Sequence, residues 1–393
     1  MLICVQNLIN KGLVLAGHDI SAGGLITTLL EMCFANTEGG MEINLDKIKC
    51  DDIVKILFAE NPGVVIQVAD KHKAEVKKIL EDAGVGYVKI GVPTEERHIL
   101  ATLHDATYQF GIDYLRDVWY STSYLLDRKQ SMNGCAKKRF ENYKQQPLEF
   151  VFDKSFTGKL SQFGLDPNRR TPSGIKAAII REKGTNGERE MAYMLYLAGF
   201  DVKDVTMTDL ISGRETLEDI NMVVYCGGFS NSDVLGSAKG WAGSFLFNPK
   251  AKAALDNFYA REDTLSLGVC NGCQLMMELG LITPEDKKKG KMLHNDSHKF
   301  ESNFLGVTVP MNRSVMFGSL SGSKLGIWVA HGEGKFSLPY PEDHYNVVLK
   351  YSYDEYPGNP NGSDYSVAGI ASQDGRHLAM MPHLERACFP WEN

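Results

Sequence analysis

A cysteine between two glycines is the residue of this chain best placed to do covalent chemistry. Residues 268–274 read Gly-Val-Cys-Asn-Gly-Cys-Gln and follow the apolar segment 265–267. An extended segment, a tight turn and then a helix would put Cys270 at a helix N-terminus, where backbone amides favour the nucleophilic thiolate. The flanking glycines leave room for a tight turn and for a substrate to approach the backbone. The pattern is the cysteine counterpart of a nucleophile elbow and predicts covalent catalysis.

The second cysteine of this segment leaves two other interpretations open. Cys270 and Cys273 form a C-x-x-C pair, which could be a redox couple or half of a zinc site. A zinc site needs further ligands, and the nearest candidates are His294 and His298. Cys270 could also be a small buried residue without a chemical role. The glycines and the predicted strand-to-helix corner favour the nucleophile.

A thiolate nucleophile needs a base, and the base needs a group that orients it. Two His-x-Glu pairs follow apolar segments, His331 with Glu333 and His383 with Glu385. On an extended backbone, positions i and i+2 point to the same side, so either pair could set an imidazole beside a carboxylate. Spacing alone does not choose between them, and each could instead be a surface pair or a satisfied polar pair.

Acyl transfer also needs backbone amides that hold the developing oxyanion. Gly227 and Gly228 follow the apolar segment 222–226, and Asn271 follows the candidate nucleophile. Their amides are the candidate donors. Taken alone, the two glycines are better explained as an ordinary turn.

These residues need a scaffold, and the second half of the chain predicts one. From residue 174 onward apolar segments alternate with helical ones. This predicts strands at 175–180, 201–205 and 222–226, a helix at 187–198, and a strand that leads to Cys270. Continuous apolar strands separated by helices indicate an α/β fold with a doubly wound, mostly parallel sheet. Chemistry in such sheets gathers at the carboxyl ends of the strands.

The first half predicts two further regions. Residues 1–105 are expected to form an α+β module, and residues 106–172 a helical and irregular connector before the domain 173–393. The pattern within the module predicts helices at 2–12, 23–35, 51–59 and 70–83 and strands at 41–45, 63–68, 86–90 and 98–102.

The bulk properties exclude several classes of function. The chain has 393 residues, enough for two or three domains, and 43% hydrophobic and 23% charged residues, which is typical of a soluble globular protein. A net charge of -7 gives no footprint for nucleic acid, and no apolar segment is long enough to cross a membrane. Eight scattered cysteines indicate reduced thiols and a cytoplasmic location. We therefore expect neither a nucleic-acid partner nor a membrane.

Taken together, the motifs resemble those of class I glutamine amidotransferases, whose domain has a flavodoxin-like sheet. The resemblance rests on residues 268–274, on Gly-Gly-Phe-Ser at 227–230 and on His-Leu-Glu-Arg at 383–386. Further segments narrow it to the glutaminase domain of the phosphoribosylformylglycinamidine synthase family, namely 181–192, 233–236 and 331–334.

The N-terminal part resembles the same family in its large single-chain form. Segments 13–25 and 58–63 are similar to the end of the synthetase half, a module like the C-terminal domain of aminoimidazole ribonucleotide synthetase-like proteins. Trp119, 122–124 and 135–136 resemble the connector of that form. The resemblance therefore covers nearly the whole chain.

The resemblance implies a role for each matched residue of the glutaminase domain. Cys270 would form a glutamyl thioester, His383 would act as general base and acid, and Glu385 would orient the histidine. This resolves the choice that spacing left open. The segment 331–333, with His331 and Glu333, would then be a substrate-pocket loop.

Other matched residues receive supporting roles. Gln274 would belong to the substrate site, and Cys273 would be a structural neighbour. In the N-terminal module, Asp19 would bind Mg²⁺ and Ser21 would contact ATP. A hard oxygen ligand suits magnesium, and a helix that starts near Gly23 can face phosphates. Without the family, an N-cap role for Asp19 or Ser21 explains the motif nearly as well.

The implied parent reaction is the ATP- and glutamine-dependent amidation of formylglycinamide ribonucleotide, a step of purine biosynthesis. The chain would supply the ammonia and would be a fragment that depends on the rest of the synthetase polypeptide. Two alternatives remain. One is a stand-alone hydrolase of γ-glutamyl amides, and the other is a non-catalytic regulatory or assembly module that keeps a glutaminase fold.

Overall fold

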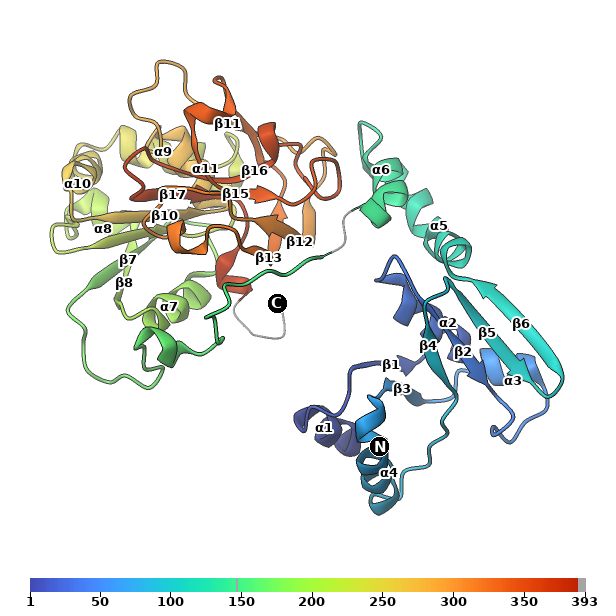
Figure 1. Cartoon of the computed structure of the whole chain (residues 1–393). Coiled ribbons are helices and arrows are strands. Elements are labelled where there is room, and N and C mark those ends of the chain that lie inside the picture. The colour runs from blue at the N-terminus through green and yellow to red at the C-terminus, as the bar shows by residue number, and fades with distance from the viewer. Residues whose placement is uncertain (146–147, 388–393) are drawn as a thin grey trace. The chain divides into compact units, whose positions relative to one another are not determined.

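The computed structural model describes residues 1–145 and 148–387 (Figure 1). The chain divides into two compact units, Met1–Leu126 and Asp127–Asn393, called unit 1 and unit 2. The helix α5 (Ile112–Gln130) carries the chain from the first unit into the second.

Unit 1 contains helices packed against a small mixed sheet. The strands β4, β2, β5 and β6 form a four-stranded sheet in that order, and β1 pairs with β3 in a separate antiparallel ribbon. Apolar side chains of α2, including Leu25 and Leu29, share a buried cluster with Ile43 and Ile99 of the sheet. The α+β prediction is confirmed. The elements are α1 (Leu2–Asn10), β1 (Ala16–Ile20), α2 (Gly24–Phe34), β2 (Gly40–Asn44), α3 (Ile53–Phe58), β3 (Gly63–Gln67), α4 (Lys73–Asp82), β4 (Gly91–Thr94), β5 (His98–Leu103) and β6 (Ala106–Gly111).

The strand predicted at 86–90 is wrong, because the strand lies at β4, further along the chain. The segment 86–90 contains strand-favouring Tyr87 and Val88, but both side chains are exposed. Pairing with β2 begins instead at Gly91, where a Cβ would lie 2.1 Å from the carbonyl oxygen of Glu42. Only glycine allows that close approach.

Two other strands of unit 1 were not predicted. β1 lies within a segment that the sequence left unassigned. β6 comes from residues assigned to the connector, and it pairs along its whole length with β5. The connector range 106–172 therefore starts with a strand of the unit 1 sheet and continues into α5.

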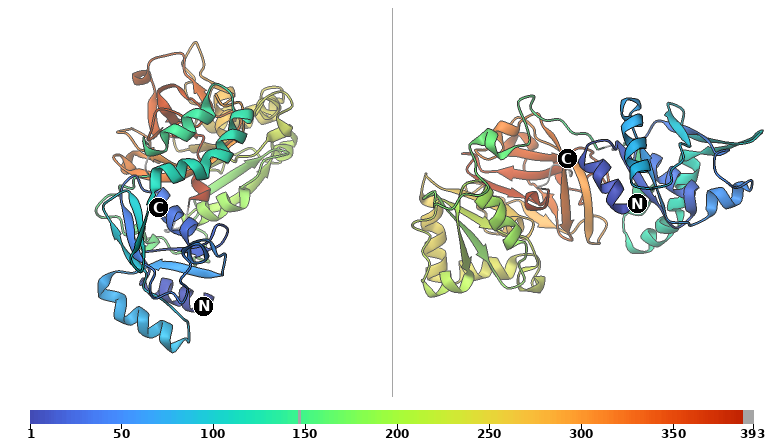
Figure 2. Two further views of the ribbon diagram at one scale, coloured as in Figure 1. Left: turned by 90° about the vertical axis from the view of Figure 1, so that its right-hand side faces the viewer. Right: turned by 90° about the horizontal axis from the view of Figure 1, so that it is seen from below.

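Unit 2 is built on one nine-stranded sheet, visible in Figures 1 and 2 as the green, yellow and red strands. Its elements are α6 (Cys135–Glu141), β7 (Lys176–Arg181), α7 (Glu188–Leu197), β8 (Asp201–Thr206), α8 (Met207–Ser212), β9 (Met222–Tyr225), α9 (Lys239–Leu246), α10 (Pro249–Ala260), β10 (Leu265–Val269), α11 (Asn271–Glu278), β11 (Lys291–Leu293), β12 (Glu301–Thr308), β13 (Lys324–His331), β14 (Lys335–Ser337), β15 (Asn346–Tyr351), β16 (Val367–Ala371) and β17 (His377–Met380).

Half of this sheet has the predicted doubly wound topology. The strands run β8, β7, β9, β10 and β17, all parallel, which is the flavodoxin-like order 2-1-3-4-5 when they are numbered along the chain. Figure 1 shows α9, α10 and α11 on one face and α7 on the other. The remaining strands, β16, β15, β12 and β13, extend the sheet in antiparallel fashion and were not predicted.

The parallel half positions the chemistry described below. β10 lies between β9 and β17, and Val269 at its end is level with Met380 at the end of β17. The segments that follow these two strands therefore leave the sheet side by side. Cys270 begins one of them and His383 lies in the other.

Glycines let α11 pack unusually close to the sheet. A Cβ on Gly272 would lie 2.0 Å from the carbonyl oxygen of Tyr225, and one on Gly268 would lie 2.5 Å from the carbonyl oxygen of Gly272. Backbone atoms cannot yield that much space, so both positions require glycine. This close contact sets the start of α11 directly against the end of β9.

Candidate active site

The predicted strand–turn–helix corner is present at Cys270. The residue is the N-cap of α11 and has φ +52° and ψ -106°, a backbone conformation that residues other than glycine rarely adopt. Its amide donates a hydrogen bond to the carbonyl oxygen of Met380 at 2.9 Å, which fixes the corner to β17. Its Sγ lies 3.5 Å from the carbonyl oxygen of Ala330. The corner thus holds the sulfur at the positive end of the helix dipole.

A buried histidine–carboxylate pair lies beside this corner. Nδ1 of His383 is 2.6 Å from Oε1 of Glu385, and both side chains are almost completely buried. The amide of His383 donates to the carbonyl oxygen of Trp328 at 2.8 Å, so β13 also holds the histidine. A proton on Nδ1 leaves Nε2 as the reactive nitrogen.

The imidazole and the cysteine flank one glycine. A Cβ placed on Gly227 would lie 2.8 Å from Cε1 of His383 and 3.4 Å from Cβ of Cys270. The ring interacts with Cys270 both through charge and through a side-chain hydrogen bond. The absence of a side chain at Gly227 therefore leaves room for both groups.

Charge interactions keep His383 protonated at neutral pH. Burial favours the neutral ring, but a Cys270 thiolate and the Glu385 carboxylate outweigh it and raise the pKa of His383 to about 9. An imidazolium beside a cysteine sulfur can donate a proton to a leaving group. The pair can therefore supply a nucleophile and a proton donor together.

The second His-x-Glu segment has a different environment. His331 is buried, and burial together with the positive charge of His383 lowers its pKa to about 3. Its Nδ1 faces Oδ1 of Asn295 at 3.2 Å. Glu333 turns away, and its Oε2 accepts a hydrogen bond of 3.4 Å from the amide of Ser237. His331 is thus a neutral ring held by an amide side chain.

A pocket of about 210 Å³ opens onto the cysteine. It brings together five sequence-predicted residues: Gly228, Cys270, Gln274, His331 and Glu333. The remaining lining comes from Phe229, Asp233, Ser237, His294, His298, Lys299, Phe300, Ala330 and Gly332. His294 and His298, considered above as zinc ligands, lie here with their rings stacked 6.0 Å apart.

Sequence reasoning missed two charged groups of the pocket. Burial, together with the negative charge of Glu333, raises the pKa of Asp233, so two carboxylates share one part of the wall. Such a pair attracts a cation. Lys299 contributes a positive charge elsewhere in the lining. Asp233 belongs to the segment 233–236 that resembles the family, but the sequence assigned it no role, and no motif marks Lys299.

Asn271 and Gln274 bind the pocket loops to one another. The amide of Ser230 donates to Oδ1 of Asn271 at 3.1 Å, and Nδ2 of Asn271 donates to Oε1 of Gln274 at 2.8 Å. Nε2 of Gln274 then donates to the carbonyl oxygen of Glu333 at 2.8 Å. The side chains of Asn271 and Gln274 thus join two loops, at Ser230 and at Glu333, to the start of α11.

The two glycines after β9 form a strained turn. Gly228 has φ +119°, and a Cβ there would lie 2.6 Å from the carbonyl oxygen of Gly184. The amide of Asn186 donates to the carbonyl oxygen of Gly227 at 2.9 Å. These contacts hold the glycine turn next to the cysteine corner, on the side of the pocket.

The second cysteine of the C-x-x-C pair lies in the core. Cys273 is fully buried, and burial raises its pKa far above the ordinary value. Across residues 1–145 and 148–387, no three His, Cys, Asp or Glu side chains are grouped as metal ligands. Seven cysteines in those ranges are free thiols, and Cys388 lies outside the described residues.

The predicted nucleotide residues of unit 1 lie far along the chain from this site. Asp19, at the end of β1, is exposed, and Ser21 follows it ahead of α2. The amide of Gly23 at the start of α2 donates to Oε1 of Glu60 at 2.9 Å. A single exposed carboxylate fits a magnesium ion held mainly by nucleotide phosphates. A phosphate at the Gly23 amide would have to displace Glu60.

No helix in the described part of the chain is both long enough and apolar enough to cross a membrane.

Comparison with known proteins assigns both parts of the chain. Residues 174–393 match the family described as CobB/CobQ-like glutamine amidotransferase domain, and residues 1–104 match the family described as AIR synthase related protein, C-terminal domain. The probable phosphoribosylformylglycinamidine synthase of Arabidopsis thaliana, named chloroplastic/mitochondrial, is 39% identical over 99% of this chain. The phosphoribosylformylglycinamidine synthase of Homo sapiens is 38% identical over 98% of it.

The chain is much shorter than these relatives, because it spans 28% of the first and 31% of the second. Among solved structures, PurLQS from Thermotoga maritima is 28% identical with a TM-score of 0.45, and the match covers 56% of this chain and 92% of that one.

Proposed function

Because the chain belongs to the family of CobB/CobQ-like glutamine amidotransferase domains, we propose that Cys270, His383 and Glu385 hydrolyse glutamine and release ammonia. The observation that carries this proposal is the Cys270 corner beside the buried His383–Glu385 pair, with the pocket opening onto the sulfur. A thiolate, a proton donor and an orienting carboxylate are the parts that acyl transfer needs.

Acylation starts from the thiolate–imidazolium pair. The Cys270 sulfur attacks the side-chain carbonyl carbon of glutamine and forms a carbon–sulfur bond. The carbon–nitrogen bond then breaks, and the His383 imidazolium gives its proton to the departing nitrogen, which leaves as ammonia. The pKa of about 9 keeps His383 protonated for this step at neutral pH.

Deacylation uses the same histidine in the opposite sense. Neutral His383 takes a proton from water at Nε2, and the water oxygen attacks the thioester. The carbon–sulfur bond breaks, glutamate leaves after its new carboxyl group loses a proton to solvent, and the thiolate–imidazolium pair is restored. Glu385 holds the proton on Nδ1 throughout, so that Nε2 faces the reaction.

Backbone amides stabilise the tetrahedral intermediates. The amides of Asn271 at the start of α11 and of Gly228 in the glycine turn are the proposed donors. The first amides of a helix have no partner within the helix, and the helix dipole adds to their effect on an oxyanion. The glycine turn lies beside the cysteine because no Cβ is present at Gly227.

The pocket suits a small amino acid with charges of both signs. Its volume of about 210 Å³ is below the range of sites for drug-sized ligands. The carboxylates of Asp233 and Glu333 complement the α-ammonium group of glutamine. His331 and Gln274 complete the proposed substrate site.

The larger reaction is a further proposal, supported by the names of the relatives. The ammonia would serve an ATP-dependent conversion of formylglycinamide ribonucleotide to the amidine, carried out with the rest of a synthetase polypeptide. Asp19 would provide one ligand to a nucleotide-bound Mg²⁺, which screens phosphate charge, and Ser21 would contact the nucleotide. The free cysteine thiols support a cytoplasmic location, whereas the Arabidopsis relative is named chloroplastic/mitochondrial.

A glutamine-analogue electrophile tests the proposed glutaminase. We expect 6-diazo-5-oxonorleucine to label Cys270, as mapped by mass spectrometry, and glutamine to protect against the label. Cys270→Ala should abolish both the label and ammonia release, and Cys273→Ala should keep both. Labelling at Cys273, or ammonia release by Cys270→Ala, would contradict the proposal. Ammonia release that needs no other polypeptide or ribonucleotide would favour a stand-alone hydrolase.

A further inference from the structure

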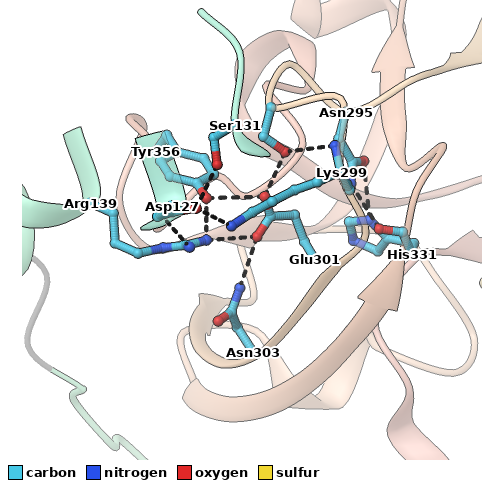
Figure 3. A network of polar contacts seen from close by, with 10 residues as sticks. Asp127, Ser131, Arg139, Asn295, Lys299, Glu301, Asn303, His331 and Tyr356 are labelled. Carbon is cyan, nitrogen blue, oxygen red and sulfur yellow. Dashed lines mark hydrogen bonds and ion pairs between the residues drawn. The ribbon is translucent and has the colours of Figure 1, made fainter. Parts of the chain in front are cut away.

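A buried network of charges joins the connector helices to the rim of the candidate pocket (Figure 3). Its centre contains two carboxylates and two cations: Asp127 at the end of α5, Arg139 on α6, and Lys299 and Glu301 before and at the start of β12. All four belong to unit 2. The side chain of Glu301 is 1% exposed and that of Asp127 9%.

The carboxylate of Asp127 binds both cations, and that of Glu301 binds one cation and a hydroxyl group. Asp127 binds Nη1 of Arg139 at 2.9 Å and Nζ of Lys299 at 2.5 Å. Glu301 binds Nη2 of Arg139 at 2.8 Å and accepts a hydrogen bond of 3.0 Å from the hydroxyl of Tyr356. The charges balance, so each partner compensates the burial of the others.

The protonation states agree with this balance. Burial alone would raise the pKa of Asp127, but hydrogen bonds from Lys299 and Ser131, with the charge of Arg139, lower it. Burial and the charge of Glu301 raise the pKa of the Tyr356 hydroxyl, which therefore remains a donor. The lowered pKa favours the charged form of Asp127, which pairs with both Arg139 and Lys299.

The connector binds the segment that forms one wall of the pocket. We call residues 294–300 the pocket loop, because four of them contribute to the pocket wall. Lys299 is one of these four. The connector also holds the loop by its backbone. The amide of Met132 donates to the carbonyl oxygen of Ser297 at 2.9 Å, and Nδ2 of Asn133 donates to that of Asp296 at 2.7 Å.

The pocket loop in turn holds the second side of the pocket. Asn295 donates through Nδ2 to the carbonyl oxygen of His331 at 2.7 Å and through its amide to that of Gly332 at 2.9 Å. Its Oδ1 accepts from the amide of Gly334 at 3.0 Å and faces Nδ1 of His331. A continuous set of contacts therefore runs from Asp127 to the loop of residues 331–334.

We propose that Asp127 and Arg139 are positioning residues for the glutamine pocket, acting through Lys299, Glu301 and the pocket loop. This inference rests on the proposed glutaminase function. Neither residue lines the pocket, so they act on its shape and not on the reacting atoms. The end of α5 then controls how well glutamine is bound, while the Cys270 corner, which is held by β10 and β17, stays reactive.

The variant Asp127→Asn in the full chain tests the positioning role, because it removes the negative charge of residue 127 and keeps the size and shape of its side chain. We expect the concentration of 6-diazo-5-oxonorleucine that gives half-maximal labelling of Cys270 to rise about tenfold or more, as for other coupled buried pairs. Iodoacetamide, which needs only the thiolate, should label Cys270 within about twofold of the wild-type rate. Hydrogen exchange of amides 295–301 should accelerate about tenfold.

Two matched variants control the experiment. Asp127→Glu keeps the charge and should recover a large part of the wild-type labelling. Lys137→Gln removes an exposed ion pair with Glu141 on the same helix α6, 3.7 Å long, and should leave all three measurements unchanged.

Two results would overturn the inference. One is an Asp127→Asn variant with unchanged half-maximal concentration and unchanged exchange. The other is a parallel loss of labelling by both reagents, which indicates general loss of structure. If the analogue does not label wild-type Cys270 in a saturable manner, the proposed glutaminase fails. Hydrogen exchange of the pocket loop alone then decides whether Asp127 positions it.

Discussion

The contact between Gly227 and the candidate catalytic pair makes the alanine variant at this position a sharp test. A Cβ at residue 227 would lie 2.8 Å from Cε1 of His383. To reach an ordinary contact of 3.4 Å, the ring must retreat by about 0.6 Å. The bond of Nδ1 to Glu385 at 2.6 Å and the backbone bond to Trp328 oppose this retreat.

The expected magnitude follows from this displacement. Overpacking of a buried site costs about 1–3 kcal/mol of folding free energy. A misplacement of about 1 Å in a catalytic group can cost on the order of a hundredfold in rate. For Gly227→Ala we therefore expect the rate of ammonia release to fall by about 10- to 100-fold, or about 1.4–2.7 kcal/mol in activation free energy.

The assay combines ammonia release from glutamine with thermal unfolding of the same preparation. Gly318→Ala is the matched control, since the nearest atom to its Cβ would be the carbonyl oxygen of Asn312 at 3.9 Å. It should keep the wild-type rate and stability within error. A folded Gly227→Ala protein that releases ammonia within about twofold of the wild-type rate would refute the argument, because the histidine could then react from a displaced position.

Three other substitutions have definite expected outcomes. Glu385→Gln should lower the pKa of His383 from about 9, so the alkaline fall in the rate of glutamine-dependent acylation should move to lower pH; an unchanged pH profile argues against the pair. Cys273→Ala should lower the free energy of unfolding in urea by about 1–2 kcal/mol and leave glutamine hydrolysis intact; loss of hydrolysis in a folded variant would give Cys273 a chemical role. Gly272→Ala would place a Cβ 2.0 Å from the carbonyl oxygen of Tyr225, so it should destabilise the domain by at least about 3 kcal/mol in the same urea assay, and a near-native midpoint would contradict the packing.

The cysteine corner could be predicted from sequence because its determinants are local. Gly268 lies near the end of an apolar strand, Cys270 follows the strand directly, and Gly272 lies in the first turn of the next helix. The structure explains why glycine is needed at positions 268 and 272, since a Cβ at either position would collide with backbone atoms. The parallel strands were predictable for a similar reason, because each is a short, continuous apolar segment.

The partner of the cysteine could not be chosen from spacing alone. His383 and His331 are both followed by glutamate at i+2, and the difference lies in the contacts of each pair. His331 lines the pocket and His383 lies beside the cysteine corner, but His383 binds Glu385 at 2.6 Å, whereas His331 faces Asn295 and Glu333 accepts from the amide of Ser237. The resemblance to a family supplied the assignment that local pattern did not. Its catalytic roles remain a proposal.

The charge network and the antiparallel half of the sheet were not predictable for the same physical reason. Asp127 and Lys299 are 172 positions apart, and nothing near either residue indicates the other. The strands β12, β13, β15 and β16 are stabilised by pairing with one another more than by local propensity. The segment 86–90 shows the converse, since its favourable local composition forms no strand and its last residue, Ile90, accepts a single backbone bond from Asn44 of β2 at 2.6 Å.

The position of β17 in the sheet has a consequence for synthesis of the protein. β17 is the last strand along the described part of the chain, yet it lies between β16 and β10, in the interior of the sheet. Until the ribosome has delivered residues 377–380, β10 lacks its neighbour on that side and the two halves of the sheet cannot join. The same segment brings His383 to Cys270. A nascent chain therefore completes its central sheet and acquires the protonated partner of its thiolate in one late event, so no earlier folding intermediate carries the assembled pair.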